Sequence, residues 1–335
     1  MNLIPHGMGE SKTASNAADF FALNVSFEQR RKAIYALLAV TLVWGATFIW
    51  MKQALDNLEL EKAQFGKNSV VATLVAARFA IATIVMLTFF PKARTALRDK
   101  EMWKGGLPLG ILMFLAYFSQ MVGLDDIDPS VSAFLTSLYV VFTALVTTYL
   151  AKKKPTRIMF SGVLLATFGA GFIKGPPHVE WGIGEVLTVI CAVLFALHII
   201  FTQRITLIRD PIGISTTSFT IVTILSILMV FLLGDGGDTK QWTLVASDGV
   251  LWPVLLLGLG GTFFCLLLLN LYQRYLHPVQ AAIIYALEPV WATAIGLSLG
   301  MVDWTFWIAV GGGSLFIGNI IVETLGASPN VEEEK

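Results

Sequence analysis

Charged residues are scarce in this chain of 335 amino acids: they make up 14% of it, whereas 56% of the residues are hydrophobic. The mean hydropathy of +0.72 is too high for a soluble domain, which needs more polar surface to face water. Neither sign of charge is in excess, because 23 basic residues balance 23 acidic ones, and a nucleic-acid partner therefore has no support. The composition predicts a polytopic protein embedded in a lipid bilayer.

Cysteine and the common catalytic motifs are also nearly or wholly missing. Cys191 and Cys265 both fall inside apolar stretches, where we interpret them as small buried residues. We find no phosphate-binding loop, no His and Cys set with metal-ligand spacing, and no Ser, His and Asp order. These absences exclude an ATP-driven pump, predict neither a metal nor a cofactor, and favour a protein that is not an enzyme.

Long apolar runs, by contrast, are abundant. Runs of about 18 to 24 residues, each long enough to cross a bilayer as a helix, predict ten spans. They lie near residues 33–53, 69–90, 106–124, 129–150, 156–173, 182–202, 213–233, 250–273, 278–300 and 303–323. No short apolar core with a cleavage site precedes the first run, so we interpret residues 1–32 as a cytoplasmic tail.

Basic residues gather on one side of these spans. The tail and the connections after spans two, four, six and eight, with Lys335, hold 17 of the 23 basic residues, and the other connections hold five. Those other connections carry carboxylates such as Asp125, Asp126 and Asp128. The positive-inside rule therefore predicts that both termini of this multi-pass protein are cytoplasmic and that it lies in the cytoplasmic (inner) cell membrane.

The chain also repeats itself at a constant offset of 149 residues. The offset carries Pro129 to Pro278, and the glycine pair at 162 and 169 to the pair at 311 and 318. Each repeat holds five spans, and an odd number inserts the second copy upside down. The acids before Pro129 become Arg274 and His277 before Pro278, as inversion under the positive-inside rule requires.

The two five-span halves, the run LDDIDPSVSAFLTSLYVVFTAL at 124–145, Glu288-Pro289, Trp44-Gly45 and the glycine-rich last span of each half resemble the EamA family of the drug/metabolite transporter superfamily. The resemblance covers residues 33 to 325. It implies an all-α carrier of ten transmembrane helices, arranged as two inverted repeats around a central cavity, and relatives that export amino acids or other small metabolites. We expect a tail at 1–32, repeats at 33–173 and 182–325, an external connection at 174–181 and a cytoplasmic tail at 326–335.

Glu288, followed by Pro289, lies at the middle of the ninth span. A carboxylate at that depth costs a few kcal/mol and indicates a functional group facing a bundle interior or a wet cavity. Pro289 clashes with the carbonyl of Tyr285 and predicts a kink there. The first half has Val140 at the equivalent position, so we expect only the second half to be kinked.

Polar residues form a stripe on span nine and on its first-half counterpart, since residues three and four apart share a helix face. The stripes predict either a shared cavity between spans four and nine or a tight helix interface. Their members are Ala281, Tyr285, Glu288, Ala292 and Gly296 in the second half, and Ser132, Thr136, Tyr139, Thr143 and Thr147 in the first.

Spans one and six contribute a second related set, and spans three and eight add amides. The candidate cavity residues there are Trp44, Thr47, Phe195, His198, Gln120 and Asn270, with a structural hydrogen-bonding role as the alternative for His198. We expect Gln273 to lie at the membrane interface.

Arg78 is the one basic residue well inside a span. It is a candidate ion-pair partner of Glu288, because each charge is costly alone in the membrane. The alternative is that Arg78 reaches the interface or binds freed backbone carbonyls. The glycine pairs of spans five and ten predict close packing, either between these spans or in a homodimer.

Together these features favour a secondary transporter that exports a small organic metabolite, an amino acid or an amphiphilic compound, by alternating access. Glu288 could couple transport to protons or could bind an ammonium group of the substrate. A passive facilitator or channel is the first alternative, and an intramembrane lipid-modifying enzyme is a weaker one.

Overall fold

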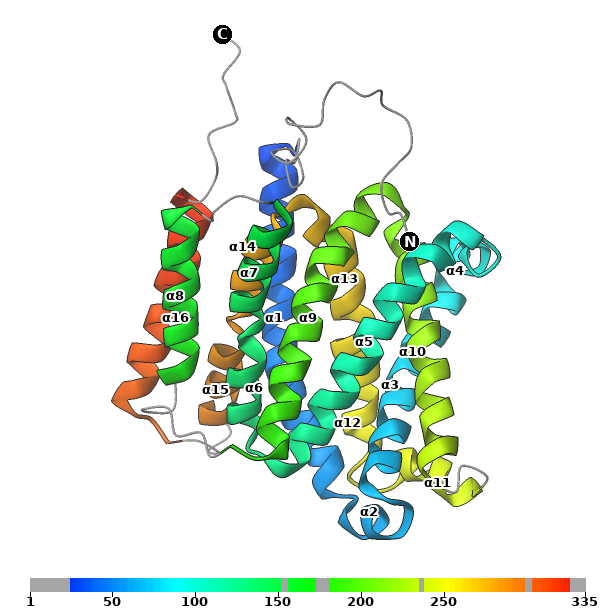
Figure 1. Cartoon of the computed structure of the whole chain (residues 1–335). Helices are drawn as coiled ribbons and strands as arrows, with labels where there is room; N and C mark the ends of the chain where they lie inside the picture. The colour runs from blue at the N-terminus through cyan, green and yellow to red at the C-terminus, as the bar shows by residue number, and fades with distance from the viewer. Residues whose placement is uncertain (1–24, 152–155, 173–180, 235–237, 299–302, 326–335) are drawn as a thin grey trace.

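The computed structural model describes residues 25–151, 156–172, 181–234, 238–298 and 303–325, and within these ranges every regular element is a helix (Figure 1). Most of the predicted tails, at 1–32 and 326–335, and of the predicted connection, at 174–181, lie outside the described residues.

Eight helical segments of the described chain are long and apolar enough to cross a membrane. They are α1 (Phe27–Asp56), α3 (Lys67–Phe89), α5 (Lys100–Asp126), α6 with α7 (Pro129–Ser137 and Tyr139–Ala151), α9 (Ile183–Ile208), α10 (Pro211–Leu233), the column of α12, η2 and α13 (Leu251–Leu256, Leu257–Phe264 and Cys265–Tyr272), and α14 with α15 (Pro278–Tyr285 and Glu288–Ser298).

Two further apolar helices, α8 (Arg157–Phe172) and α16 (Phe306–Leu325), contain shorter apolar stretches. The remaining elements are short: α2 (Glu59–Phe65), α4 (Pro91–Ala96), α11 (Thr239–Thr243), η1 (Leu244–Ala246) and η3 (Gln273–Tyr275). Every predicted span thus corresponds to helical residues, and the chain has the architecture of an all-helical, multi-pass membrane protein.

Helix starts follow the local sequence. Ser26 caps α1 with a capping box to Gln29, and Asp210 accepts hydrogen bonds from two backbone amides of the first turn of α10. Pro129, Pro211 and Pro278 each occupy the first turn of a helix, where the missing amide is no loss.

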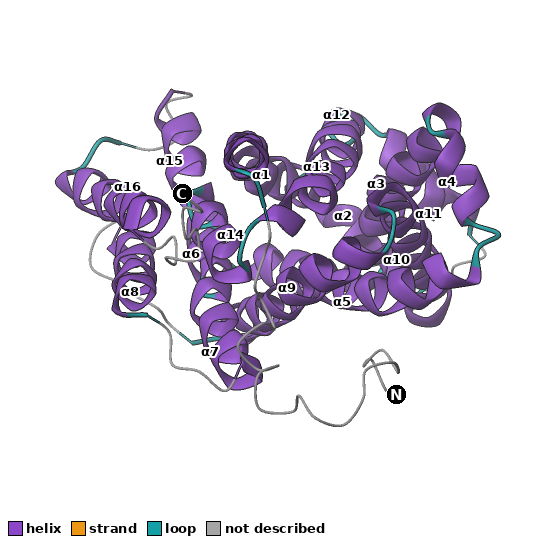
Figure 2. Ribbon diagram, turned by 90° about the horizontal axis from the view of Figure 1, so that it is seen from above, coloured by secondary structure: helices purple, strands orange, loops and turns teal. Residues whose placement is uncertain are grey.

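The helices run between two ends of the bundle (Figure 1). We call the end where α1 begins the N-terminal end, at the top of Figure 1, and the opposite end, where α2 lies, the α2 end. In the view of Figure 2, α8 and α16 lie at one side of the molecule, and α3 and α10 at the other.

Two long segments are broken near their middles, at equivalent places. Leu138 separates α6 from α7, and residues 286–287 separate α14 from α15, which matches the offset of 149. The amide of Leu138 donates to the carbonyl of Leu135, and that of Leu287 to Ile284, so each break is a tight turn. The prediction of a kink in the second half alone is therefore wrong.

The reason lies in packing rather than in proline. The two broken segments contact each other piece by piece: α6 packs on α15, and α7 packs on α14. A break in one segment is thus matched by a break in the segment that faces it.

The glycine pairs bring α8 and α16 together. A Cβ at Gly169 would lie 2.5 Å from the Gly311 carbonyl oxygen, and one at Gly318 would lie 3.1 Å from that of Gly162. Of the two uses predicted for these glycines, the structure has close packing between the last helices of the two halves.

Candidate functional site

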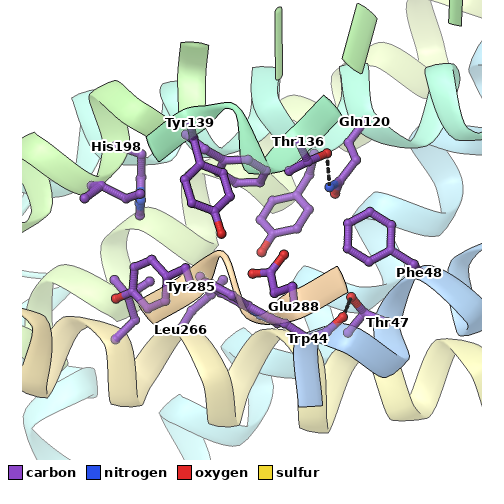
Figure 3. Close-up of a pocket in the computed structure, with 14 residues that line it drawn as sticks. Trp44, Thr47, Phe48, Gln120, Thr136, Tyr139, His198, Leu266, Tyr285 and Glu288 are labelled. Atoms are coloured by element: carbon purple, nitrogen blue, oxygen red, sulfur yellow. Dashed lines mark hydrogen bonds between the residues drawn. The ribbon is translucent and has the colours of Figure 1, made fainter. Parts of the chain in front are cut away.

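A cavity lies where the two broken segments meet the helices around them (Figure 3). Its lining comes from α1, α5, α6, α7, α9, α13, α14 and α15, and consists of Trp44, Thr47, Phe48, Tyr117, Gln120, Thr136, Tyr139, Phe195, His198, Ile199, Leu266, Leu269, Tyr285 and Glu288.

Glu288 is the first residue of α15, directly after the break. Its residue is 6% exposed, and among the described residues its carboxylate has neither a hydrogen bond nor an ion pair. Figure 3 shows the carboxylate pointing into the space between Tyr139 and Phe48. A helix start favours negative charge nearby, but an ionised carboxylate that is buried without a partner is costly, so the group is neutral or meets a charged partner that enters the cavity.

Aromatic rings form much of the wall around Glu288. The rings of Trp44 and Tyr285 meet edge to face, with 5.5 Å between their centroids, and those of Tyr117 and Phe195 do so at 5.2 Å. The indole nitrogen of Trp44 donates to the carbonyl oxygen of Gly261 over 3.0 Å. These contacts hold the rings in fixed orientations, which favours a ligand with an apolar or aromatic body.

The polar residues of the lining make few hydrogen bonds, and those of Gln120 and His198 are long. Gln120 donates to the Thr136 hydroxyl over 3.4 Å, and the Thr47 hydroxyl donates to the carbonyl oxygen of Trp44 over 2.7 Å. Both ring nitrogens of His198 lie 3.5 Å from the hydroxyl oxygen of Thr202. The cavity therefore retains hydrogen-bonding capacity for a ligand.

Nine of the eleven residues predicted for a cavity line this one, all except Thr143 and Asn270. Thr143 is buried on α7, beyond the cavity. Asn270 is a correction: its amide donates to the Ser215 hydroxyl over 2.7 Å, so it faces α10 and links that helix to α13. The sequence showed its polarity but not the side of the helix on which its partner lies.

Five lining residues were not predicted: Phe48, Tyr117, Ile199, Leu266 and Leu269. Four of them are apolar residues among many such residues, and nothing in the sequence distinguishes them. Tyr117 did carry a signal, because it precedes Gln120 by three residues and so shares its helix face.

Arg78 does not form the predicted ion pair with Glu288 in this structure. Its Nε donates to the Thr262 hydroxyl over 2.9 Å, one terminal nitrogen lies 3.6 Å from the Met51 sulfur, and its guanidinium carbon lies 4.5 Å from the Tyr117 ring centroid. Thr262 lies in η2, a π-helical stretch, and a widened turn of this kind exposes groups that an α-helix would not offer. Arg78 thus supports the cavity wall through Tyr117 and does not itself line the cavity.

At the α2 end, ion pairs join α2 and α3 to the end of α5, which is one wall of the cavity. Lys62 on α2 binds Asp125 at the end of α5 over 2.6 Å, with side chains 7% and 10% exposed, and also binds Glu59 over 2.6 Å. Burial alone would lower the pKa of Lys62, but the hydrogen bonds and charges of the two carboxylates outweigh it, and the pKa is raised. Lys67 pairs with Asp126, and Lys52 of α1 donates to the Asp125 carbonyl over 3.0 Å.

Toward the N-terminal end, Arg209 at the end of α9 pairs with Glu101 of α5 over 3.2 Å, and the buried links are uncharged. The Tyr285 hydroxyl donates to the Gln273 side-chain oxygen over 2.9 Å, and the Gln273 amide donates to the Ile199 carbonyl oxygen over 2.5 Å. Gln203 of α9 donates to the Leu276 carbonyl oxygen over 2.9 Å. Gln273 is fully buried, so its predicted place at the interface is wrong: its amide bridges two residues that line the cavity.

Comparison with known proteins agrees with this architecture. The EamA-like transporter family matches residues 31–174 and again residues 182–324. An uncharacterized transporter of Archaeoglobus fulgidus is 30% identical over 281 residues, which are 81% of this chain and 82% of that protein. A solved crystal structure of a protein shares the fold, with a TM-score of 0.66 at 15% sequence identity. The match covers 89% of this chain and 98% of the chain in that structure.

These matches point to a membrane transporter rather than an enzyme, with a small-molecule substrate and the lipid bilayer as its partners. The chain belongs to the EamA-like transporter family.

Proposed function

We propose that this protein is a secondary transporter of ten membrane helices, built as two inverted repeats at 33–173 and 182–325. The short helices α8 and α16 complete the ten crossings, and the equivalent breaks at Leu138 and at residues 286–287 support two related halves. The distribution of basic residues supports a cytoplasmic N-terminal end in the inner cell membrane, and so an external α2 end. Alternating access then opens the cavity to one end at a time.

The substrate class follows from one observation: the Glu288 carboxylate lies in an aromatic cavity with no partner among the described residues. An organic ammonium group satisfies a carboxylate by charge and the faces of aromatic rings by cation–π attraction. The apolar rings accommodate an apolar or aromatic body. The substrate is thus a small amine, an amino acid or an amphiphilic compound. The proposed outward direction of transport rests on the family resemblance alone.

A binding experiment tests this substrate class. Because a ligand of the folded state raises its unfolding temperature by mass action, purified protein is heated with aromatic amines, with their uncharged analogues and with sugar phosphates. We expect the amines alone to stabilise the wild type and the Glu185→Gln protein, but not the Glu288→Gln protein. Glu185→Gln is the matched control, because Glu185 accepts from the Gly182 amide at the start of α9, outside the cavity, and glutamine retains an acceptor. Stabilisation by sugar phosphates alone would overturn the proposal.

The role of Glu288 in transport needs a second measurement, made in proteoliposomes. If Glu288 carries protons without binding the substrate, Glu288→Gln retains both substrate exchange and stabilisation by amines but loses accumulation driven by a pH gradient. If Glu288 only holds the ammonium group, both activities are lost while the protein remains folded. Absence of saturable counterflow in the wild type would favour a passive facilitator instead.

A further inference from the structure

Basic residues gather in the connection between α3 and α5, which contains the short helix α4 and lies near the N-terminal end of the bundle (Figure 1). All the basic side chains of this connection are exposed. Residues 90–104 hold five of them, Lys92, Arg94, Arg98, Lys100 and Lys104, against two acidic ones, Asp99 and Glu101. A surplus of exposed positive charge beside the end of a membrane helix attracts anions that lie at the same level.

The connection is packed closely on the bundle. Ala93 and Ala96 of α4 are 0% and 5% exposed, and α4 contacts α3 and α10. A Cβ at Gly213, near the start of α10, would lie 3.2 Å from the Ala96 Cβ, so these two helices approach closely. The Trp103 indole donates to the Leu97 carbonyl oxygen over 2.8 Å and ties the turn after α4 to α5. The basic side chains are therefore attached to a well-packed backbone.

Carboxylates of the chain neutralise only part of this charge. Lys92 binds Asp210 over 3.2 Å. Lys104 binds Glu101 one turn earlier on α5. The Asp99 carboxylate accepts from the Glu101 amide over 2.8 Å, and so caps the start of α5.

Three cations of the connection have no carboxylate partner among the described residues: Arg94, Arg98 and Lys100. They lie close together in the chain. The amide of Arg98 donates to the Thr95 carbonyl oxygen over 3.0 Å, so a helical turn continues past the end of α4. Lys100 begins α5 two residues later. Like charges so near one another repel, and an anion bound beside them relieves that repulsion.

Arg94 fixes the level of these three cations relative to the membrane. Its Nη1 donates to the carbonyl oxygens of Leu87 and Thr88 over 2.7 and 3.2 Å. Both belong to the last turn of α3, which is long and apolar enough to cross a membrane. The guanidinium thus lies where α3 leaves the hydrocarbon layer, at the level of lipid headgroups. Its Nε and Nη2 make no hydrogen bond among the described residues, and this pair of donors suits a phosphate group.

We propose that Arg94, Arg98 and Lys100 bind the phosphate headgroup of an anionic phospholipid at the end of α3. The exposed ring of Phe89, the last residue of α3, offers the acyl chains an apolar contact beside the headgroup, which a free phosphate ion does not use. A lipid bound in this way joins α4 and the start of α5 to the end of α3, and so stabilises the N-terminal end of the bundle. The site does not depend on the proposed transport function.

Lipid titration of the purified protein in a neutral detergent tests the chemistry of the headgroup. Phosphatidylglycerol, phosphatidylcholine and inorganic phosphate are added separately, and the unfolding temperature is followed, because binding to the folded state raises it. We expect saturable stabilisation by phosphatidylglycerol, and at least roughly tenfold weaker binding of phosphatidylcholine, whose headgroup has no net charge. Inorganic phosphate at the same concentration should not stabilise the protein. Equal binding of the two lipids, or equal stabilisation by inorganic phosphate, would overturn the proposal.

Charge-matched variants test the three residues. One chain combines Arg94→Gln, Arg98→Gln and Lys100→Gln. The control combines Lys32→Gln, Lys92→Gln and Lys104→Gln, which replace three lysines of the same end that each pair with a carboxylate. We expect the first chain to bind phosphatidylglycerol at least roughly tenfold more weakly than the wild type, and the control to change by less than about threefold. Equal weakening would mean that only the net charge of this end matters, and the proposal would fail.

A second pair of variants keeps the Arg94 bonds to α3 in place. Should the triple variant unfold at a lower temperature than the wild type without lipid, Arg98→Gln with Lys100→Gln replaces it, because neither side chain makes a hydrogen bond among the described residues. Lys92→Gln with Lys104→Gln is its control. We expect at least roughly fivefold weaker binding of phosphatidylglycerol, and unchanged binding would contradict the proposal. None of these measurements needs a transport substrate, so a failure here leaves the proposed function as it stands.

Discussion

The nearly buried links at the two ends of the bundle differ in chemistry, although the more exposed pair of Arg209 and Glu101 also lies at the N-terminal end. At the α2 end, Lys62 and Asp125 form a nearly buried ion pair that ties α2 to α5. Toward the N-terminal end, Gln273 links Tyr285 to the backbone of α9 by uncharged hydrogen bonds. A charged pair is sensitive to pH and salt, and removing only one of its two partners is costly because it leaves a buried charge unpaired. Hydrogen bonds of an uncharged amide are insensitive to both pH and salt. The two ends should therefore respond to different perturbations.

The largest expected effect is from Asp125→Ala at the α2 end. It leaves Lys62 nearly buried with Glu59 as its remaining carboxylate partner among the described residues, and so lowers the free energy of unfolding by about 3 kcal/mol. Denaturant unfolding in detergent measures the change. The control is Asp126→Ala, whose side chain is 48% exposed and which should cost no more than about 1 kcal/mol. Equal costs for the two variants would show that burial of the pair does not matter.

A smaller effect is expected from Gln273→Leu at the other end. The variant removes the acceptor of the Tyr285 hydroxyl and the donor to the Ile199 carbonyl, at a cost of about 2 kcal/mol. A cysteine placed at Thr47, in the cavity, should then react faster with a thiol reagent added from the N-terminal side. Gln64→Leu, which replaces an exposed glutamine on α2, serves as the control. Unchanged labelling would mean that Gln273 does not close this end.

Alkaline pH should loosen the α2 end alone. The raised pKa of Lys62 means that its contribution to stability is complete below the ordinary lysine value of 10.5 and is lost as the pH rises through the higher folded-state pKa. The stability difference between wild type and Lys62→Met should therefore be constant below pH 10.5 and shrink above it. A difference that shrinks toward acidic pH instead would contradict this origin.

Salt should have the smallest effect. At 1 M ionic strength the screening length falls to about 3 Å, which weakens the exposed pair of Lys67 and Asp126 by less than about 0.5 kcal/mol. Stability of the Gln273→Leu protein relative to wild type should not change with salt, because the lost bonds carry no charge. A salt-dependent difference there would erase the contrast between the two ends.

Several features were predictable because they depend on short-range patterns. Apolar runs of membrane length located the eight helical segments that are long enough to cross a membrane. Helical spacing and the offset of 149 residues placed Tyr139, Thr136, Tyr285 and Glu288 on facing stripes, and all four line the cavity. Such patterns are visible in sequence because burial and helix periodicity act on each segment separately.

Other features were not predictable because they depend on which segments touch. No proline near Leu138 indicates a helix break there, and this break matches the one in the segment packed against it. Arg78 was a candidate ion-pair partner of Glu288, but Thr262, Met51 and the Tyr117 ring surround it. Gln273 was expected to face water, yet packing buries it between α14 and α9.

The sequence by itself determined the membrane class, the helical segments and the presence of one carboxylate in the middle of a span, because hydrophobicity and helix period are local properties. Tertiary structure alone decided that this carboxylate has no partner among the described residues of an aromatic cavity, and that Arg78 supports the cavity wall rather than pairing with Glu288. Those outcomes depend on contacts between distant segments, and pairing of polar groups across helices is set by packing geometry rather than by composition.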